Sequence, residues 1–355
     1  MRRKTKVIRI GRVRIGGNHP VAIQSMTKTK TSDINRTVKQ IRKLENAGCE
    51  IVRLAVKDNK DTEALKRIRK ITKLPLVADI HFNWRLAIEA IEAGADKIRL
   101  NPGNIYKKKE IKEIVSALKI AKIPLRIGLN SGSLSRIKNQ ASSIRDHASL
   151  MVKAALDYAR IIEKFGFYNI VLSLKASNIL DTIEAYRKIS VLCDYPMHLG
   201  LTATGLPFSG AIKSSIAIGA LLLEGIGDTI RVSLTDQPQH EIRAAQYILE
   251  SLGLRCFGPQ IISCPTCGRC QVDLVKLVRD FENKLTAYPL PLTTKLSKIA
   301  IMGCEVNGPG EAREADIGIA FGKKAGVLFK KGKIARRVSY SGSSGYLLNE
   351  LRKTI

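Results

Sequence analysis

Aromatic side chains and acidic side chains are both scarce in this sequence. Phe, Trp and Tyr make up 5% of its 355 residues, and there is a single tryptophan. The sequence has 31 Asp and Glu residues against 60 Lys and Arg residues, which gives a formal net charge of +29 at pH 7. An excess of positive charge this large usually indicates an anionic partner.

Nucleic acid is one anionic partner to consider. However, the sequence has no stretch in which basic and aromatic residues are interleaved for base stacking. The basic residues are also spread along the whole chain, whereas a nucleic-acid surface needs them on one face. We therefore favour an enzyme with a lysine-rich surface that acts on an anionic metabolite, and we expect no nucleic-acid partner.

Long apolar runs and an even cysteine count are absent as well. No run of 18 or more apolar residues occurs, so we expect no transmembrane helix and no membrane partner. Charge interrupts the apolar residues that follow the basic start, so we expect no signal peptide. Seven cysteines without an export signal argue against a disulfide framework, and Cys49, Cys193 and Cys256 are interpreted as buried, inert thiols. These features predict a cytoplasmic protein.

Short β-branched runs alternate with segments of helical periodicity along the first 255 residues. In the first such helical segment, Ser32 or Asp33 is the expected N-cap and Gly48 the expected stop. A short hairpin is expected in the first 20 residues. The predicted strands after it are Ala22–Met26, Ile51–Val56, Leu76–Ile80, Lys97–Asn101, Leu125–Asn130, Ile170–Lys175, Met197–Thr202 and Asp228–Thr235.

Eight strands that alternate with helices predict a closed (β/α)8 TIM-type barrel over residues 1–255. A doubly wound open sheet is the alternative, but no Gly-x-Gly-x-x-Gly follows the first strand. The pattern changes after about residue 254, which predicts a separate small α/β domain at residues 256–355. Its expected elements are a helix near Val272–Leu285, strands Lys298–Met302 and Ile317–Phe321, and a hairpin of Gly326–Phe329 and Lys333–Val338.

Charged residues stand in the predicted barrel strands, where charge is costly unless it is paired or functional. They lie mostly toward the carboxyl ends of the strands, where barrel active sites are found. One clear strand acid, Asp79, cannot pair with all of the cations, and the excess indicates an anionic, phosphorylated substrate. The residues concerned are Arg53, Asp79, Arg99, Asn101, Arg126, Asn130, Lys175 and Arg231, with His81 directly after the third strand.

Four cysteines form a candidate metal site in the second domain. Three of them occur in Cys264-Pro-Thr-Cys267-Gly-Arg-Cys270, and the fourth is Cys304. A zinc site normally takes two Cys-x-x-Cys knuckles, and only one pair is present. Loops rich in glycine and proline favour an iron–sulfur cluster instead. The spacing also differs from the Cys-x-x-x-Cys-x-x-Cys of radical S-adenosylmethionine enzymes.

The segment after Cys304 contains Gly308-Pro-Gly310-Glu311, for which we predict a tight turn that swings Glu311 back toward Cys304. On its own, Glu311 would be an ordinary surface acid. Beside a cluster, its carboxylate could serve as an exchangeable ligand that leaves one iron open to substrate.

Several motifs in order along the whole chain resemble the 4-hydroxy-3-methylbut-2-enyl diphosphate synthase family of the non-mevalonate isoprenoid pathway. They are Gln24-Ser-Met-Thr27, Ala78-Asp-Ile-His-Phe82, Ile98-Arg-Leu-Asn-Pro-Gly-Asn104, Arg126-Ile-Gly-Leu-Asn-Ser-Gly-Ser133, His198-Leu-Gly200, Glu224-Gly-Ile-Gly-Asp-Thr-Ile-Arg-Val-Ser-Leu-Thr235, Cys264-Pro-Thr-Cys267 and Met302-Gly-Cys-Glu-Val-Asn-Gly-Pro-Gly-Glu311.

The resemblance implies an oxidoreductase that reductively opens the ring of 2-C-methyl-D-erythritol 2,4-cyclodiphosphate and dehydrates it. It implies a [4Fe–4S] cluster, flavodoxin or ferredoxin as the electron donor, and a head-to-tail homodimer. By motif, Asp79 and His81 would orient the site, and Glu311 would have a catalytic role. The implied cluster ligands are Cys264, Cys267, Cys304 and Glu311; the implied ligands of the cyclic diphosphate are Arg53, Arg99, Arg126, Asn130, Lys175, Arg231 and Ser233.

One position departs from the family pattern. The family usually has Thr-Glu-Ala-Gly where this chain has Thr202-Ala203-Thr204-Gly205. Ala203 therefore occupies the position of the glutamate to which the family's proton transfer is assigned. Two rival interpretations stay open from the residues alone. One is a pterin-binding barrel synthase with a ferredoxin-like module, and the other is a basic nucleic-acid-binding protein with a zinc module.

Overall fold

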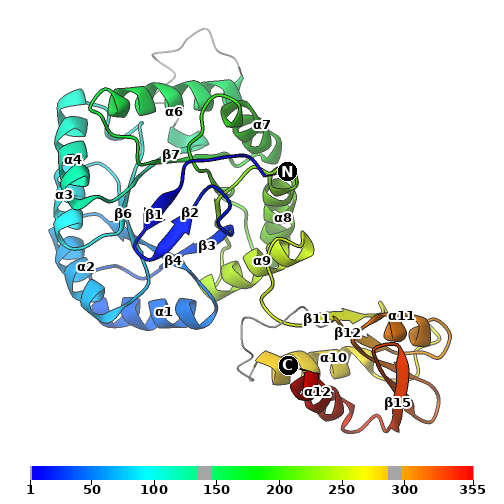
Figure 1. Cartoon of the computed structure of the whole chain (residues 1–355). Helices are drawn as coiled ribbons and strands as arrows, with labels where there is room; N and C mark the ends of the chain where they lie inside the picture. The colour runs from blue at the N-terminus through cyan, green and yellow to red at the C-terminus, as the bar shows by residue number, and fades with distance from the viewer. Residues whose placement is uncertain (1, 134–145, 287–297, 355) are drawn as a thin grey trace. The chain divides into compact units, whose positions relative to one another are not determined.

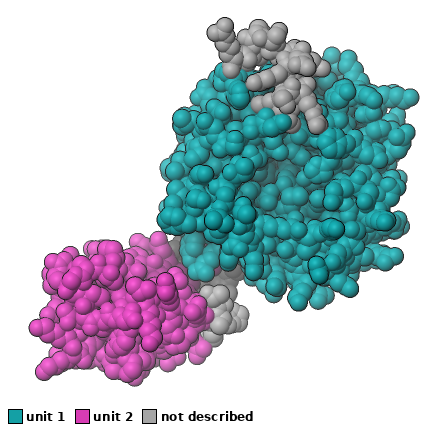
Figure 2. Space-filling view, turned by 180° about the vertical axis from the view of Figure 1, so that it is seen from behind, with its two compact units in different colours: residues 1–255 teal, residues 256–355 magenta. Residues whose placement is uncertain are grey.

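The computed structural model describes residues 2–133, 146–286 and 298–354. The chain divides into two compact units, Met1–Arg255 and Cys256–Ile355 (Figure 2). Within the described ranges, no helix combines the length and apolar composition needed to cross a bilayer.

The first unit is a barrel of eight parallel strands inside a ring of helices (Figure 1). Neighbouring strands follow the order β8-β7-β6-β5-β4-β3-β10-β9. A parallel bridge between Leu172 and Met197 closes the barrel between β8 and β9. The strands are β3 Ala22–Met26, β4 Ile51–Val56, β5 Leu76–Ile80, β6 Lys97–Leu100, β7 Leu125–Asn130, β8 Ile170–Lys175, β9 His198–Leu199 and β10 Thr229–Ile230. The predicted TIM-type barrel is therefore confirmed.

The helices between the strands pack their apolar sides on the barrel. In α1, the Asp33 carboxylate caps the backbone N–H of Arg36, and Val38, Ile41 and Leu44 are buried. The chain then turns at Gly48, whose φ of +92° favours glycine. The helices are α1 Ile34–Asn46, α2 Asn59–Ile71, α3 Arg85–Glu92, α4 Lys108–Ala121, α6 His147–Glu163, α7 Ile179–Ser190, α8 Pro207–Leu223 and α9 Pro238–Ser251, with a 3-10 turn, η1, at Ser131–Ser133.

The last two barrel strands are shorter than the sequence predicts. Each has two residues, whereas runs of six and eight residues were expected. The chain leaves the sheet at Gly200, where φ is +155° and a Cβ atom would lie 2.5 Å from the carbonyl oxygen of Arg231. The two segments are thus too close for a side chain at position 200, and regular pairing ends there.

The hairpin expected in the first 20 residues is present, and it closes the amino-terminal end of the barrel. Strands β1 Ile8–Ile10 and β2 Val13–Ile15 pair antiparallel. Ile8, Ile10 and Ile15 are buried against residues near the start of four barrel strands. Figure 1 shows the hairpin inside the ring of helices. The opposite, carboxyl end of the strands is therefore the end that is available for a substrate site.

The second unit is a five-stranded sheet with helices. Its strand order is β11-β12-β13-β14-β15; β11, β12 and β13 are parallel, and β14 and β15 continue antiparallel. Phe281, Phe321 and Leu347 are among the residues of its core. The elements are β11 Gln260–Ser263, α10 Leu274–Thr286, β12 Lys298–Met302, α11 Gly308–Glu314, β13 Ile317–Phe321, β14 Gly326–Lys330, β15 Lys333–Val338 and α12 Ser343–Thr354. The sequence reasoning missed β11, α11 and α12.

Candidate functional site

Six cationic side chains converge inside the barrel from five strands or strand ends, with Lys97 and Arg99 both on β6. Four of them are at most 6% exposed: Lys97, Arg99, Arg126 and Lys175. The side chains of Arg53 and Arg231 are 13% exposed. We call these six residues the barrel cation cluster. Lys97 was not predicted as a site residue, although its position at the start of β6, where apolar residues are the rule, was a signal.

Asp79 on β5 is a counter-ion within this cluster. Its two carboxylate oxygens lie 3.0 Å from Nη1 of Arg99 and 3.6 Å from Nε of Arg53. Burial by itself would raise the pKa of Asp79, but Arg99, Arg53 and Arg126 outweigh it and hold the pKa well below its usual range. Asp79 is therefore an anion that fixes two arginines, as its predicted orienting role requires.

A second buried carboxylate, missed from the sequence, lies on α9. The Glu241 side chain is 1% exposed and accepts a hydrogen bond from Ser25 Oγ at 3.0 Å. It also lies 3.1 Å from Nζ of Lys28 and 3.5 Å from Nε of Arg231. Two buried acids thus neutralise part of the barrel cation cluster, Asp79 beside Arg53 and Arg99 and Glu241 beside Arg231. Glu241 lies on a helix, so it could not be recognised as a counter-ion from the acids in the predicted strands.

Lys97 and Arg126 share a neutral partner in place of an acid. Nζ of Lys97 and Nη1 of Arg126 each lie 3.5 Å from Oε1 of Gln24. Burial first, and then neighbouring arginines, lower the pKa of both cations well below their usual values. The lowered pKa means that burial disfavours the charged forms of both side chains. An anion bound beside them would stabilise the charged forms.

Lys175 lies at the end of β8, against Gly200. A Cβ atom at position 200 would approach its Nζ to 2.6 Å, so the glycine gives the lysine room. Burial, followed by the charges of Arg231 and Arg53, lowers the pKa of Lys175. Within the described residues, no carboxylate forms an ion pair with Lys175. The surplus of positive charge is therefore a physical property of this end of the barrel, and it suits a ligand with several negative charges.

His198 lies beside this surplus and stays neutral. Its Nδ1 lies 2.8 Å from Oγ1 of Thr229, and its buried Nε2 has no hydrogen-bond partner among the residues that the structure describes. Burial, and then the charge of Lys175, lower the pKa of the imidazole well below its usual value. In the sequence, His198 stands out only as part of the motif His198-Leu-Gly200.

The remaining predicted barrel residues also lie at strand carboxyl ends. His81 directly follows β5 and is half-buried, and Asn130 ends β7 opposite Lys175. Ser233 is half-buried, and its carbonyl oxygen accepts a hydrogen bond from Oγ1 of Thr204. Ala203 is exposed and has a φ of +54°, in the left-handed region.

The cysteine segments of the second unit lie at the carboxyl ends of two adjacent strands, which we call the cysteine end of the sheet. Cys264 follows β11 directly and Cys304 follows β12, and these two strands pair in parallel. The backbone N–H of Gln271 donates to the carbonyl of Gly303 at 2.8 Å, which joins the two segments. All the cysteines have free thiols. Within the described residues, no three Cys, His, Asp or Glu side chains lie close enough together to hold a metal ion.

The Cys304 thiol has the chemistry of a metal ligand. Backbone N–H groups of Asn307, Val306 and Gly308 lower its pKa, and the charge of Arg269 contributes. Because the thiolate is the form that binds metals, this environment favours ligation. Cys270, in contrast, donates its S–H to the carbonyl of Val272 at 3.2 Å and packs on the core. Cys264 packs on that core as well, so packing alone does not separate their roles.

The predicted tight turn at residues 308–310 is wrong. Gly308–Glu314 forms the helix α11, and Pro309 stands in its first turn, where a missing N–H costs nothing. Glu311 is exposed in the same turn, and its backbone N–H donates to the carbonyl of Asn307 at 3.3 Å. The carboxylate is thus placed by a helix that starts three residues after the Cys304-Glu305 pair.

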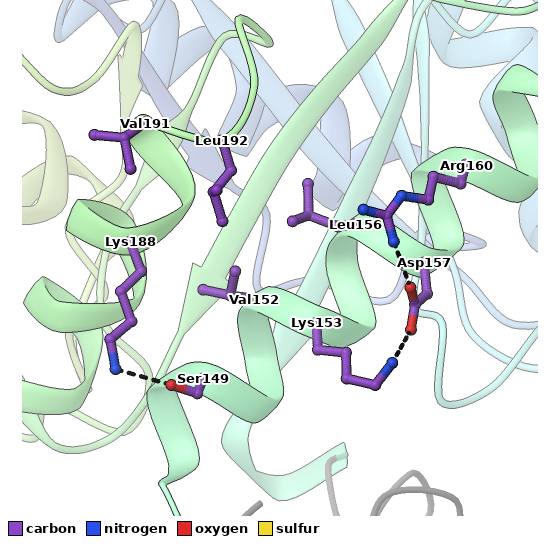
Figure 3. Close-up of a pocket in the computed structure, with 9 residues that line it drawn as sticks. All are labelled: Ser149, Val152, Lys153, Leu156, Asp157, Arg160, Lys188, Val191 and Leu192. Atoms are coloured by element: carbon purple, nitrogen blue, oxygen red, sulfur yellow. Dashed lines mark hydrogen bonds and ion pairs between the residues drawn. The ribbon is translucent and has the colours of Figure 1, made fainter.

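A hollow of about 460 Å³ lies elsewhere, on the outside of the barrel. Figure 3 shows that it lies between α6 and the end of α7, with Val152, Leu156 and Leu192 directed into it. Its carboxylate, Asp157, is paired with Lys153 and Arg160. The hollow brings together no group of residues with catalytic chemistry, and it is separate from the cation cluster.

Comparison with known families matches both units of the chain. Residues 5–246 match the GcpE TIM-barrel domain, and residues 260–353 match the GcpE protein C-terminal domain. A relative from Caldanaerobacter subterraneus subsp. tengcongensis is 52% identical over 100% of this chain and 98% of its own length. A second, from Fusobacterium nucleatum, is 50% identical over the same shares. Both are named 4-hydroxy-3-methylbut-2-en-1-yl diphosphate synthase (flavodoxin).

Solved structures of a different enzyme share the barrel. Dihydropteroate synthase from Xanthomonas albilineans superposes with a TM-score of 0.52 at 12% identity, over 70% of this chain and 98% of that one. The enzyme from Thermus thermophilus gives 0.51 at 16% identity, over 70% and 99%. At such low identity, the likeness shows the fold alone.

Proposed function

This chain belongs to the GcpE family, the 4-hydroxy-3-methylbut-2-en-1-yl diphosphate synthases, and from that premise we propose how its residues divide the work. The chain is an iron–sulfur oxidoreductase of isoprenoid precursor synthesis. It reductively opens and dehydrates 2-C-methyl-D-erythritol 2,4-cyclodiphosphate to (E)-4-hydroxy-3-methylbut-2-enyl diphosphate. The observation that carries the assignment of the substrate site is the barrel cation cluster, in which six cations face two buried acids.

In our proposal, the barrel cation cluster binds the cyclic diphosphate. Within the described residues, Arg126 and Lys175 have no carboxylate partner, while Arg53, Arg99 and Arg231 are oriented by Asp79 and Glu241. Arginine suits phosphate oxygens because its N–H groups match them in pairs. Asn130, at the end of β7, and Ser233, after β10, complete the predicted set, and Lys97 joins it through its shared contact with Gln24.

We propose that the redox cofactor binds at the cysteine end of the sheet in the second unit. Cys264, Cys267 and Cys304 would hold a [4Fe–4S] cluster, with Glu311 as a fourth, replaceable ligand. The free thiols on two joined segments, and the lowered pKa of Cys304, fit such a group. When bound, the cluster supplies the reducing electrons one at a time. His81, half-buried beside Asp79, is the candidate for moving a proton, because Ala203 cannot.

Flavodoxin, which the relatives' names specify, is the proposed electron donor, with ferredoxin as the alternative. We place the enzyme in the cytoplasm, where flavodoxin is available. A head-to-tail homodimer, in which one chain's barrel faces the other chain's cysteines, completes the proposal. In such a dimer, the substrate-binding barrel of one chain would meet the cluster-binding cysteines of the other chain, which lie in separate units of each chain.

Kinetics of Arg126→Ala test the substrate site. Loss of hydrogen bonds from a charged group costs about 1.5–3 kcal/mol, which corresponds to a rise of roughly 10- to 150-fold in KM. Iron content should not change. Arg160→Ala on the outer surface of α6 is the matched control and should behave as wild type. A wild-type KM in Arg126→Ala would remove this residue from the site.

Mixing two impaired variants tests the shared site, at a substrate concentration below the wild-type KM, where each variant alone has little activity. Arg126→Ala and Cys304→Ser chains, refolded together, should regain activity, because a mixed dimer has one site with both parts intact. A mixture that stays inactive, although subunit exchange is demonstrated, would contradict the head-to-tail arrangement.

The rival enzyme interpretation is not favoured. The barrel does share its fold with dihydropteroate synthases, but at 12–16% identity, against about half of all positions for the family relatives. Turnover of the cyclic diphosphate with dithionite, and no turnover of a pterin diphosphate, is the expected result. The nucleic-acid interpretation is likewise not favoured by the family match.

A further inference from the structure

The second unit carries a basic segment that the proposed function does not use. Residues 322–338 contain seven Lys and Arg residues and no Asp or Glu. They form β14, β15 and the loop before β14. All five residues Lys333–Arg337 of β15 are exposed, and so are Lys323 and Lys324. Because β15 is an edge strand, nothing in the sheet covers its outer side.

Part of this segment lies at the same end of the sheet as the cysteines. Strand β13 runs parallel to β12, so the loop Gly322–Ala325 leaves β13 at the end where Cys304 follows β12. A Cβ atom at Gly322 would lie 2.9 Å from Oε2 of Glu305, the neighbour of Cys304. This loop joins β13 and β14, which lie one and two strand spacings from β12, or about 5–10 Å.

The end of β15 extends this basic region. Arg337 pairs with Val327 and Val338 with Gly326, so Arg337 lies at the cysteine end. We define the basic rim as Lys323, Lys324 and Arg337; Arg336, the preceding residue, points to the opposite face of β15. Arg336 stacks over the ring of Tyr346 at 4.2 Å. Within the described residues, no carboxylate pairs with Lys323, Lys324 or Arg337, so their charge is directed outward.

An edge strand often carries Lys and Arg simply to prevent pairing with another sheet. That explanation suits Lys333 and Arg337, which are in β15. It does not account for Lys323 and Lys324, because these two residues stand in a loop and have no edge to protect. Glu305 is an acid close to this loop, since its Oε2 would lie 2.9 Å from a Cβ atom at Gly322, but the rim residues themselves include no acid.

We propose that the basic rim is the docking surface for an electron-carrier protein with carboxylates around its redox centre, a flavodoxin. The inference rests on the proposed function, which places the cofactor at the neighbouring cysteines. Complementary charge steers two proteins together and orients them, which suits a transient encounter for electron transfer. A donor bound to a rim beside the cysteines would have its redox centre near the iron–sulfur cluster proposed there. A donor bound to charge elsewhere on the surface would not.

Charge reversal at two ends of one sheet provides the test. Cluster-loaded Lys323→Glu/Lys324→Glu should show a KM for reduced flavodoxin at least about 10-fold higher than wild type, with a weaker dependence on salt. Its turnover with dithionite, which needs no docking, should equal that of wild type. The control is Lys331→Glu/Lys333→Glu, which makes the same charge change at the β14–β15 turn, the opposite end of the sheet.

Each other outcome overturns the proposal in a recognisable way. Equal losses in both double variants would show that only net charge matters. A parallel loss with dithionite would assign the rim to the substrate or to contacts within the enzyme. A lowered affinity for duplex DNA, with the flavodoxin KM unchanged, would assign it to nucleic acid. Failure of the proposed function itself is distinct, because wild-type enzyme would then not turn over the cyclic diphosphate even with dithionite.

Discussion

Asp79 is the residue at which the stability of the barrel and its surplus of positive charge are most directly coupled. In Asp79→Asn, the side chain keeps its shape, but Arg53 and Arg99 lose their shared counter-ion. Removing one partner of a buried ion pair costs about 3–5 kcal/mol. Since the amide oxygen can still accept from Arg99, we expect the lower end, about 3 kcal/mol. For a unit of this size, that lowers Tm by roughly 6–12 °C.

Asp157→Asn on α6 is the matched control for this measurement. Asp157 also contacts two cations, Lys153 and Arg160, but its side chain is 44% exposed, against 4% for Asp79. Exposed pairs contribute about 0.2–1 kcal/mol, so Tm should fall by no more than roughly 4 °C. Thermal unfolding followed by circular dichroism measures both variants. Equal changes in Tm would refute the argument that burial, and not the number of ion pairs, decides the magnitude.

The same variant has a defined pH dependence. Because the pKa of Asp79 is depressed in the fold, its stabilisation is complete above the unfolded-state pKa, about 3.9, and is lost as the pH falls through the folded-state value. The difference in stability between wild type and Asp79→Asn should therefore be constant from about pH 5 to 7 and shrink below about pH 4. A difference that is lost already near pH 6 would indicate another titrating group.

Three further outcomes are expected. Cys270→Ser should keep most of the iron and activity after anaerobic purification, whereas Cys304→Ser should lose both; the reverse pattern of iron content would exchange their roles. Ala203→Gly should raise the free energy of unfolding by about 1 kcal/mol, because alanine is strained at a positive φ, and a destabilised variant would contradict that backbone conformation. Inorganic pyrophosphate should raise the Tm of wild type more than that of Arg126→Ala, and equal shifts would place the anion outside the cation cluster.

The sequence predicted the elements whose pattern is local. Strands β3, β4, β5, β7 and β8 have the predicted bounds, because β-branched runs flanked by helix caps and glycines leave few alternatives. It overestimated β9 and β10, whose length is limited by a contact between Gly200 and Arg231, far apart along the chain. Long-range contacts of this kind leave no local pattern.

The candidate site shows the same division. The strand cations could be recognised because charge in a barrel strand is unusual. Their second counter-ion, Glu241, could not, since an acid in the first turn of a helix is ordinary and only the fold brings it to Arg231. At Gly308-Pro-Gly310, residues typical of a turn form the start of a helix instead. Proline and glycine are compatible with both structures there, and the contacts of α11 with β12 and β13 decide between them.

The hairpin that closes the barrel also constrains when the barrel can form during synthesis. Its isoleucines contact Val171, and just before it Arg2 forms an ion pair with Asp228 at 2.9 Å. These partners leave the ribosome long after the hairpin does. Contacts between residues so distant in sequence form late and make folding slow. A nascent chain shorter than about 170 residues lacks Val171 and would therefore leave part of the apolar face of its hairpin uncovered, a stage at which a chaperone would be expected to bind.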